Sequence, residues 1–260
     1  MSTGEIFQEL YLAPQQNSLP AGVRVGPVLF SHALLPVDPA TQKVVPGDME
    51  AQLRAVFQNM DGFLTAAGAS QSDVAHITLF MAQVSDRTAM NAVYKTWYPD
   101  PNNRPPHKYV PVALPEGVLA AAQVIAVPGS ARKVIEVPGI GHQDWMSMSS
   151  LQGNLVSSSR IFGTDPATGK GSQDADEHTA IVFRNADAVL QLAGGSWDNV
   201  TQVTAFIGGA ELRATVEQQV QQRVGAGDKL ALNLLETNLG GQTAPGGRPM
   251  LPRIEVLAVL

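Results

Sequence analysis

The sequence predicts an α+β protein built from two tandem copies of one small domain. The chain has 260 residues, 44% of them hydrophobic, which is enough to form two cores of ordinary size. A turn sequence, DPATQK at Asp38–Lys43, returns as DPATGK at Asp165–Lys170, about half the chain later. Around each turn, the order of predicted elements is strands, helix, strand, helix and strands. This order is typical of a sheet covered by helices on one face.

Further matches follow the repeated turn in the same order. AVFQNM at 55–60 matches IVFRNA at 181–186, and AAGASQSDVAHITLF at 66–80 matches LAGGSWDNVTQVTAF at 192–206. The last pair, AAAQVIAV and PRIEVLAV, requires extra residues in the second copy, which we place in the Gly/Pro-rich stretch 237–249. We therefore expect two domains, residues 1–130 and 131–260.

Each element of the first copy has a local reason. A short strand, Pro27–Ser31, precedes the Asp-Pro turn. Apolar residues then recur at helical spacing, and Gly68 is suited to end that helix because glycine accepts a left-handed conformation. These apolar residues are Leu53, Val56, Phe57, Met60, Phe63 and Leu64.

The remaining elements follow from alternation and from a second helical pattern. In the first copy they are a strand at Val74–Met81, a helix at Arg87–Tyr98 and a strand at Val118–Val127. Their counterparts are Val200–Ile207, Glu211–Val224 and Arg253–Leu260. Two helices cover one face of such a sheet, so its other apolar face needs a partner, and we expect the chain to self-associate.

Composition excludes several classes of function. The chain has no cysteine, and therefore neither a thiol nucleophile nor a cysteine-based zinc site. Its formal charge is −6, and its 17 Lys and Arg residues are scattered, so we expect no nucleic-acid partner. Neither a membrane-length apolar run nor a basic leader at MSTGEIFQELYLAP is present, so we expect a cytoplasmic protein without a membrane partner.

Two groups of residues have the composition of metal ligands. They are His142 with Asp144, and His178 with Asp174, Asp176 and Glu177. Their spacings match no established site, and acidic residues also suit the first turn of a helix. We expect neither a metal nor a cofactor.

The ordered motifs resemble the RidA/YjgF/UK114 family. The resemblance covers LFSHALLPVDPATQK through NAVYKTWY in the first copy, and SSSRIFGTDPATGK through VTQVTAFI in a more divergent second copy. It implies two RidA-like (chorismate-mutase-like) domains, each a mixed β-sheet with two helices packed on one face. It also implies a homotrimer-type assembly with clefts between neighbouring subunits and, as in many members, hydrolysis of reactive enamines or imines with release of ammonia.

In that chemistry an arginine holds the substrate carboxylate and a glutamate, or the water it orients, carries protons. The glutamate position of the family pattern is Gln123 in the first copy and Glu255 in the second. Glutamine can donate and accept hydrogen bonds but cannot act as an acid or base. Glu255 is the expected acid or base, unless it is a solvated strand residue.

The arginine position of the family pattern is His107 in the first copy and falls near Asp228–Lys229 in the second. His107 is either an anion ligand or acid/base, or simply a loop histidine. Lys229 supplies charge without a planar fork, and Arg248 in the inserted loop is an alternative.

Two residues near the early family strand complete the candidate set. Arg160 is either a carboxylate ligand or the partner of a surface carboxylate, and His32 occupies nearly the same place in the first copy. His76 belongs to a strand and is expected to be packed rather than catalytic.

We therefore expect a hydrolase that acts on an imine, enamine or related C–N compound at an inter-domain cleft. Glu255 and His107 are the predicted catalytic residues. The predicted residues for binding a small anionic substrate are Arg160, Lys229, Arg248, His32 and Gln123. Two alternatives remain open: a non-catalytic metabolite-binding or assembly protein, and a cyclase or tautomerase that uses the same pocket.

Overall fold

The computed structural model describes residues 7–10, 21–83, 87–140, 145–224, 230–237 and 251–260. Internal contacts divide the chain into two compact units, Met1–Arg132 and Lys133–Leu260. Each unit is a mixed β-sheet with helices, in agreement with the predicted fold class. The domain boundary after Ser130 stays a prediction.

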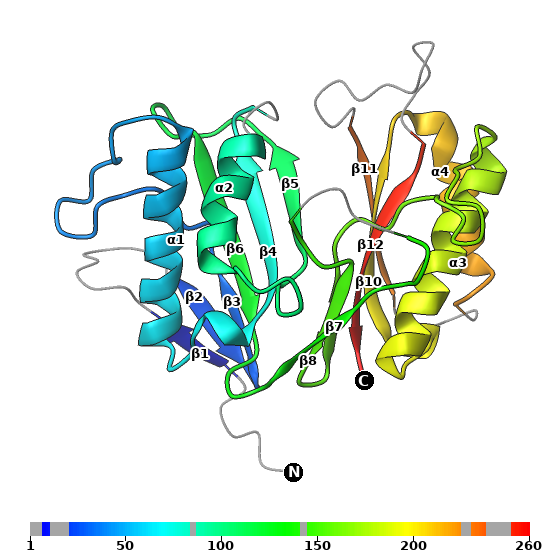
Figure 1. Ribbon diagram of the computed structural model, residues 1–260, viewed down its shortest axis with the longest axis horizontal. Helices are drawn as coiled ribbons and strands as arrows, with labels where there is room; N and C mark the ends of the chain where they lie inside the picture. The colour runs from blue at the N-terminus through cyan, green and yellow to red at the C-terminus, as the bar shows by residue number, and fades with distance from the viewer. Residues whose placement is uncertain (1–6, 11–20, 84–86, 141–144, 225–229, 238–250) are drawn as a thin grey trace. The chain divides into compact units, whose positions relative to one another are not determined.

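The first unit contains a six-stranded sheet in the order β1-β2-β3-β6-β4-β5. Its strands β4 and β5 are parallel, and the other neighbours are antiparallel. Parallel neighbours require a crossover, which α2 provides. Figure 1 shows α1 and α2 side by side on one face of this sheet. The elements are β1 (Phe7–Leu10), β2 (Gly22–Val25), β3 (Val28–Ser31), α1 (Met49–Ala66), η1 (Gln71–Asp73), β4 (Val74–Met81), α2 (Arg87–Trp97), β5 (His107–Pro111) and β6 (Ala120–Ala126).

The second unit repeats this topology, with the sheet order β11-β10-β12-β9-β8-β7. Strands β10 and β11 are the parallel pair, and α3 and α4 cover one face (Figure 1). The elements are β7 (Arg132–Ile135), β8 (Ser149–Gln152), β9 (Leu155–Ser158), α3 (Ala175–Ala193), η3 (Trp197–Asn199), β10 (Val200–Ile207), η4 (Ala210–Leu212), α4 (Arg213–Gln221), β11 (Ala231–Glu236) and β12 (Arg253–Val259).

The long helix of each unit starts at an aspartate. The side chain of Asp48 accepts a hydrogen bond from the backbone of Ala51, and that of Asp174 accepts one from Glu177. At the other end of α3, Gly194 is left-handed with φ 91°, and Gly68, the glycine predicted to end the first helix, is left-handed with φ 69°. These caps satisfy backbone groups that the helix itself leaves without partners.

One helix differs from its sequence prediction. The segment expected as a continuous helix at Glu211–Val224 forms a 3₁₀ turn, Ala210–Leu212, followed by a shorter α4. No side chain caps the start of α4, and the 3₁₀ turn tightens the chain there with backbone bonds instead. None of the helices in the described ranges is both long and apolar enough to cross a membrane.

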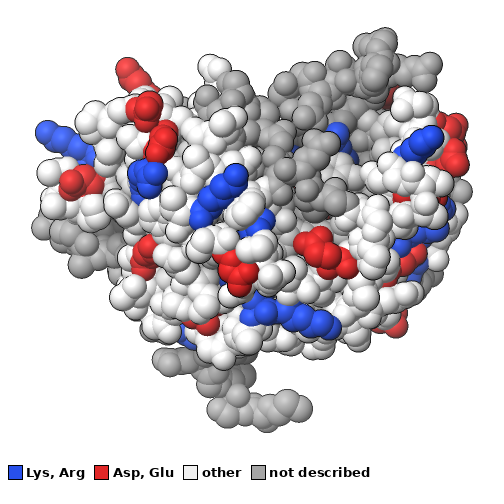
Figure 2. Space-filling model, viewed as in Figure 1, with Lys and Arg blue, Asp and Glu red and all other residues white. Residues whose placement is uncertain are grey.

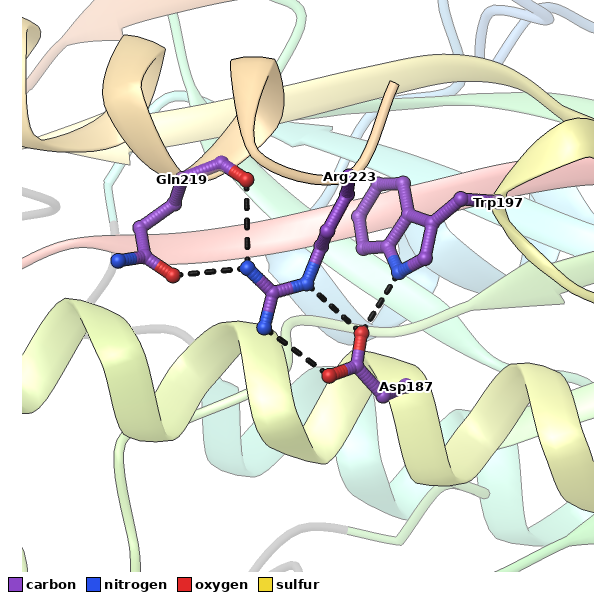
Figure 3. A network of polar contacts seen from close by, with 4 residues as sticks. All are labelled: Asp187, Trp197, Gln219 and Arg223. Atoms are coloured by element: carbon purple, nitrogen blue, oxygen red, sulfur yellow. Dashed lines mark hydrogen bonds and ion pairs between the residues drawn. The ribbon is translucent and has the colours of Figure 1, made fainter. Parts of the chain in front are cut away.

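A network of polar contacts joins α3 to the end of the α4 segment (Figure 3). Asp187 of α3 accepts two hydrogen bonds from Arg223, at 2.8 Å and 3.0 Å, and one from the indole of Trp197 at 2.6 Å. Arg223 also donates to the backbone and side-chain oxygens of Gln219. The guanidinium lies over the rings of Trp197 and Phe183. This network fixes the two helices of the second unit against each other.

The core of each unit lies between its sheet and its helices. In β12, the side chains of Ile254, Val256 and Ala258 belong to this core. Strand residues alternate between faces, so the intervening side chains point to the opposite side of the sheet. We call that opposite side the helix-free face, and it carries the candidate site.

Candidate functional site

Strand β12 places Arg253 and Glu255 on the helix-free face of the second unit. Both residues alternate with the core residues Ile254 and Val256. Glu255 is 5% exposed, which is low for a carboxylate. The sequence therefore puts one acidic and one basic side chain two residues apart on a central strand.

The neighbouring strand β10 supplies a hydroxyl group and an aromatic ring to the same face. Thr204 lies opposite Glu255 in the antiparallel register, and Phe206 lies opposite Arg253. The hydroxyl of Thr204 accepts a hydrogen bond from Gln202 at 3.1 Å. Phe206 is 2% exposed.

The segment after β9 borders the other side of β12. Ile161 forms an isolated antiparallel bridge with Ile254, through reciprocal backbone hydrogen bonds of 2.7 Å and 3.3 Å. Ile161 enters the core, so its neighbours Arg160 and Phe162 are directed to the helix-free face.

Arg160 meets Glu255 on this face. The Nε atom of Arg160 is 3.9 Å from Oε1 of Glu255, and the two side chains are 12% and 6% exposed. The Cζ atom of Arg160 also lies over the ring of Phe206, 4.3 Å from its centroid. Arg160 thus reaches across β12, past Glu255, to a residue of β10.

A second arginine reaches in the opposite direction. The Cζ atom of Arg253, on β12, lies 4.8 Å from the centroid of the Phe162 ring. Aromatic faces attract cations, and a guanidinium stacked on a ring keeps its N–H groups at its edge. The helix-free face therefore combines two ring-supported guanidinium groups with one buried carboxylate.

The distance between Arg160 and Glu255 matters for the energy of the pair. At 3.9 Å the contact is an ion pair, and it is longer than a hydrogen bond. Removing one partner of a buried pair costs about 3–5 kcal/mol, because the other charge is left in a medium of low dielectric constant. Replacing both partners together costs much less. Such a pair is therefore weak evidence for a role in stability and a candidate for function.

The first unit has the same backbone arrangement around Gln123. Gln123 lies opposite Thr78 in the register of β6 and β4, as Glu255 lies opposite Thr204. The backbone N–H of Val124 donates to the Ser31 hydroxyl at 2.8 Å. In the second unit, Val256 donates in the same way to Ser158 at 2.9 Å. Gln123 itself donates to the carbonyl oxygen of Ser31 at 3.3 Å.

The charged residues of the site have neutral counterparts in the first unit. The isolated bridge between Leu34 and Ala122 corresponds to the bridge between Ile161 and Ile254. The adjacent residues place Ala33 where the second unit has Arg160, and Ala121 where it has Arg253. Arginine, arginine and glutamate in one unit thus correspond to alanine, alanine and glutamine in the other.

His107 lies in the core of the first unit, under α2. It pairs with Ile77 in the parallel register, is 1% exposed, and its ring centroid is 4.4 Å from that of Tyr94. Its Nε2 atom is 3.0 Å from the hydroxyl of Tyr109, which donates to Asn91. The neighbouring Lys108 pairs with Thr78 and so belongs to the face that carries Gln123. His107 and Gln123 are on opposite faces of one sheet.

His32 is exposed, with Nδ1 2.9 Å from the carbonyl oxygen of Ala33. Its backbone N–H donates to Ala21, as that of Ser159 donates to Met148. His32 therefore corresponds to Ser159, one residue before Arg160.

Lys229 and Arg248 lie outside the described residues. The register of β10 and β11 nevertheless identifies the counterpart of His107. Leu232 pairs with Val203, as His107 pairs with Ile77. The strand register thus differs from the sequence alignment, which puts this position near Asp228–Lys229. Short segments that flank glycine-rich stretches are poorly aligned by pattern alone, whereas hydrogen bonding fixes the register.

Sequence reasoning missed Arg253, Phe162 and Phe206 as members of the same face. Strand alternation could have placed Arg253 beside Glu255, because they are two residues apart. The contribution of Phe162 depends on a bridge between segments far apart in the chain, for which the sequence holds no local signal.

Each unit has the same sheet topology, with two helices on one face and charged or polar side chains on the helix-free face. The chain is therefore a duplicated α+β domain, which is the class of fold that the sequence resemblance predicted. The family model described as Endoribonuclease L-PSP matches the chain twice, at residues 12–127 and 144–231. The chain therefore belongs to this family, the RidA family, and has two copies of its domain.

Curated relatives match over one domain length. A RutC family protein of Pyrococcus abyssi is 33% identical over 105 residues, which are 40% of this chain and 81% of that protein. The "Putative reactive intermediate deaminase TdcF" of Escherichia coli is 32% identical over 108 residues, 41% of this chain and 83% of that protein. Protein DfrA of Myxococcus xanthus is 35% identical over 107 residues, 40% of this chain and 79% of that protein.

Solved structures match over similar lengths. RidA from an Antarctic Psychrobacter species has 28% sequence identity and a TM-score of 0.42, covering 46% of this chain and 98% of that one. The Rid family protein YyfA of Yersinia pestis has 26% identity and a TM-score of 0.44, with the same coverage.

Proposed function

We propose that the second unit hydrolyses the C=N bond of a small anionic imine, or of the imine that forms from an enamine. The observation that carries this proposal is the buried carboxylate of Glu255 beside Arg160. Glu255 stands at the position where the resemblance implies the proton-carrying glutamate. The likeness to TdcF, whose name describes a reactive intermediate deaminase, supports the same chemistry.

The reaction needs one group that moves protons and one that holds the substrate. The Glu255 carboxylate takes a proton from water as the water oxygen bonds to the imine carbon, and it passes this proton to the nitrogen to give the carbinolamine. Glu255 then takes the hydroxyl proton of the carbinolamine and passes it to the amino nitrogen, so that the C–N bond breaks, a carbonyl forms and ammonia leaves. One imine and one water thus give one carbonyl compound and one ammonia. The anionic group of the substrate is held by a cation, for which the sequence offers Arg160, Lys229 and Arg248.

We propose that the first unit is the non-catalytic copy. Gln123 cannot carry a proton, and the positions that correspond to Arg160 and Arg253 are alanines. The packing of His107 against Tyr94 and Tyr109 favours a role in the core. Its catalytic role stays a prediction, as do the substrate-binding roles of His32 and Gln123.

The proposed working form is a trimer of chains in the cytoplasm, with each site closed by a neighbouring domain. The family resemblance supports this assembly. Nucleic acid is not among the proposed partners, although the family model is described as an endoribonuclease. Acidic and basic side chains are interspersed on the face that Figure 2 shows, whereas binding to phosphate backbones favours a clustered basic surface.

The test is release of ammonia from a freshly generated imino acid, measured against its spontaneous hydrolysis in buffer. We expect the parent protein to exceed the spontaneous rate, and Glu255→Gln to lower the catalysed rate by about 100-fold or more. The matched control is Glu217→Gln, because Glu217 is an exposed α4 carboxylate paired with Arg213. A parent protein no faster than buffer contradicts the proposal.

A further inference from the structure

We propose that His178 is a proton-dependent anchor, which holds the segment entering β12 at neutral pH and releases it in acid. His178 belongs to the first turn of α3. Release of this segment would make the candidate site sensitive to pH, and this coupling rests on the proposed function of that site. The inference follows from the contacts of His178, from its counterpart in the first unit and from the charges around it.

The imidazole of His178 faces two backbone carbonyl oxygens that belong to different segments. Its Nε2 atom is 3.1 Å from the oxygen of Pro252, and its Nδ1 atom is 3.3 Å from the oxygen of Ser172. A neutral imidazole has one N–H group and donates to one of these oxygens, whereas an imidazolium donates to both. The bonds that join α3 to the start of β12 and to the turn before the helix therefore depend on the protonation of one side chain.

Gln52 occupies the corresponding position of α1, four residues after the capping aspartate. Its Nε2 atom donates to the carbonyl oxygens of Val45 at 3.2 Å and of Gly117 at 2.7 Å, and its Oε1 atom accepts from the backbone of Leu119 at 2.8 Å. Gln52 thus joins the same two kinds of segment, the turn before the long helix and the segment entering the last strand. An uncharged amide does this at any pH. The first unit has a permanent anchor where the second unit has a titratable one.

The second unit also has space for the larger ring of His178. A Cβ atom at position Gly163 would lie 2.5 Å from the Cε1 and Nε2 atoms of His178, so a side chain there would displace the ring. The first unit has Pro36 at this position, because Pro36 and Gly163 each lie two residues before the aspartate of the repeated turn, Asp38 or Asp165. The exchange of glutamine for histidine is therefore accompanied by an exchange of proline for glycine.

His178 contacts both segments that border the candidate site. Pro252 directly precedes Arg253, and Gly163 directly follows Phe162, over whose ring Arg253 lies. Losing the contact with Pro252 would loosen the start of β12, three residues before Glu255. The state of His178 can thus reach the site through the backbone of one strand.

The charged groups near His178 come from three packed elements. They are Arg253 of β12, Asp165 and Lys170 of the turn before α3, and Asp174, Asp176 and Glu177 of the first turn of α3. The three helix carboxylates are exposed and have their own donors, which are the Glu177 backbone, the Thr215 hydroxyl and the Ser172 hydroxyl. The N-terminal end of a helix disfavours a cation as well.

Burial is the largest influence on the pKa of His178, and it lowers this pKa from the ordinary value of 6.5. The contacts with the carbonyl oxygens of Ser172 and Pro252 raise the pKa, the charge of Arg253 lowers it, and the net shift is downward. A released imidazole with the ordinary pKa therefore takes up a proton first as the pH falls below 6.5. The anchor is stable above that pH and is lost as the pH decreases towards the folded value.

The first experiment follows His178 and the β12 amides in the full chain. Nuclear magnetic resonance should give His178 a pKa below 6.5, and its signal is assigned by its absence from His178→Gln. Hydrogen exchange of the β12 amides, corrected for intrinsic rates, should accelerate from pH 7 to pH 5 by at least about 3-fold more in the parent than in His178→Gln. The ceiling is about 25-fold, because an imidazole with a pKa of 6.5 is almost fully protonated at pH 5.

Two further variants complete this experiment. His178→Ala removes the contact with Pro252, and it should accelerate exchange of the β12 amides already at pH 7. The matched control His32→Gln removes an exposed histidine of the first unit and should keep the pH dependence of the parent. Circular dichroism at both pH values confirms that each variant is folded.

The second experiment measures ammonia release from a freshly generated imino acid at pH 7 and pH 5, with the spontaneous rate subtracted. We expect kcat of the parent to fall about 3-fold more over this interval than kcat of His178→Gln. This difference tests the coupling of the anchor to the site, because the glutamine supplies two donors without a charge.

The proposals fail in distinguishable ways. A His178 pKa above 6.5, or β12 exchange with the same pH dependence in the parent and His178→Gln, overturns the anchor, whatever the activity. If the exchange results are as expected but the parent releases ammonia no faster than buffer, the anchor holds and the hydrolase proposal is wrong. If the parent is active and its pH profile matches that of His178→Gln, the coupling to the site is overturned.

Discussion

At the residue scale, the Arg160–Glu255 pair is the feature of this chain that most clearly separates its two copies. In water such a pair would contribute little, but both side chains here are largely buried. The first unit shows the neutral alternative, with Ala33 and Gln123 in the same backbone frame. The residues of the first unit therefore show which substitutions in the second unit would remove the pair without disturbing the backbone, and the energy of the pair can be measured with them.

We predict a strong coupling between Arg160 and Glu255 in a double-mutant cycle. Arg160→Ala alone should destabilise the second unit by about 3 kcal/mol, since it leaves Glu255 buried without this cation. Arg160→Ala combined with Glu255→Gln, the pair found in the first unit, should cost less than Arg160→Ala alone. Urea denaturation of the four proteins measures the coupling. Additive effects would show that the two residues do not form an energetic unit.

His76 is a second residue whose chemistry depends on its surroundings. It lies on β4, is 4% exposed, and burial lowers the pKa of its imidazole well below the ordinary value of 6.5. The positive charges of Lys108 and His107 act in the same direction. The register of β4 and β10 puts Gln202 at the corresponding position of the second unit. This packing agrees with the sequence interpretation.

We predict that acid destabilises the first unit through His76. Because its folded pKa is depressed, the unfolded chain binds a proton first as the pH falls below about 6.5. The stabilisation is therefore present above that pH and is lost as the pH decreases towards the folded value. Hydrogen exchange of the β4 amides at pH 7 and pH 5 measures the loss. His76→Gln should make this difference smaller; an unchanged difference would exclude His76 as its source.

At the element scale, an aspartate at corresponding positions of α1 and α3 accepts hydrogen bonds in both units, but from different donors. Asp187 of α3 accepts hydrogen bonds from Trp197 and Arg223 (Figure 3). In α1, Asp61 accepts hydrogen bonds from Gln71 at 2.9 Å and from the indole of Trp97 at 2.9 Å. The indole comes from the 3₁₀ turn in one unit and from the second helix in the other. The aspartate is kept, and its donors are exchanged.

We predict that Asp187→Asn destabilises the second unit more than Asp61→Asn destabilises the first. The former removes a bidentate partner from the guanidinium of Arg223, while the latter weakens hydrogen bonds from neutral donors. The expected losses are about 2 and about 1 kcal/mol. Hydrogen exchange of the α3 and α1 amides in the two variants measures them separately. Equal losses of stability in the two variants would mean that the charge of Arg223 adds nothing to the network around Asp187.

At the scale of the whole molecule, duplication lets the two copies diverge. One copy keeps neutral residues at the three positions that carry charge in the other, while the sheet order is the same in both. The second unit can therefore be selected for the residues of the candidate site, while the first unit is selected for the fold alone. The position of the insertion agrees with this view, since residues 237–249 belong to the copy with Glu255.

We predict that the protein assembles as a trimer of chains. Two helices cover one face of each six-stranded sheet, and association of chains would cover the helix-free face of each sheet. Light scattering coupled to size exclusion should give three times the chain mass of 27.5 kDa. A monomer at micromolar concentration would contradict the prediction.

The sequence by itself determined the duplication, the fold class and the position of Glu255. These features follow from hydrophobic periodicity, from turn residues and from ordered matches between the two halves. All of these signals can be recognised without knowing which residues are in contact. The strands at Val74–Met81 and Val200–Ile207 are confirmed with the predicted bounds. Each strand is a short run rich in β-branched and apolar residues that follows a glycine-ended helix, and these two signals define its bounds.

The tertiary structure decided which side chains share a face with Glu255. Arg160 and Phe162 reach it through a bridge to β12 from a segment nearly a hundred residues away in the chain, and Arg253 joins them by strand alternation. It also placed His107 under α2, on the face opposite to Gln123. The physical reason is that a one-residue change in strand register moves a side chain to the other face of the sheet. Register depends on hydrogen bonds between strands that are distant in sequence, so residue spacing alone cannot fix it.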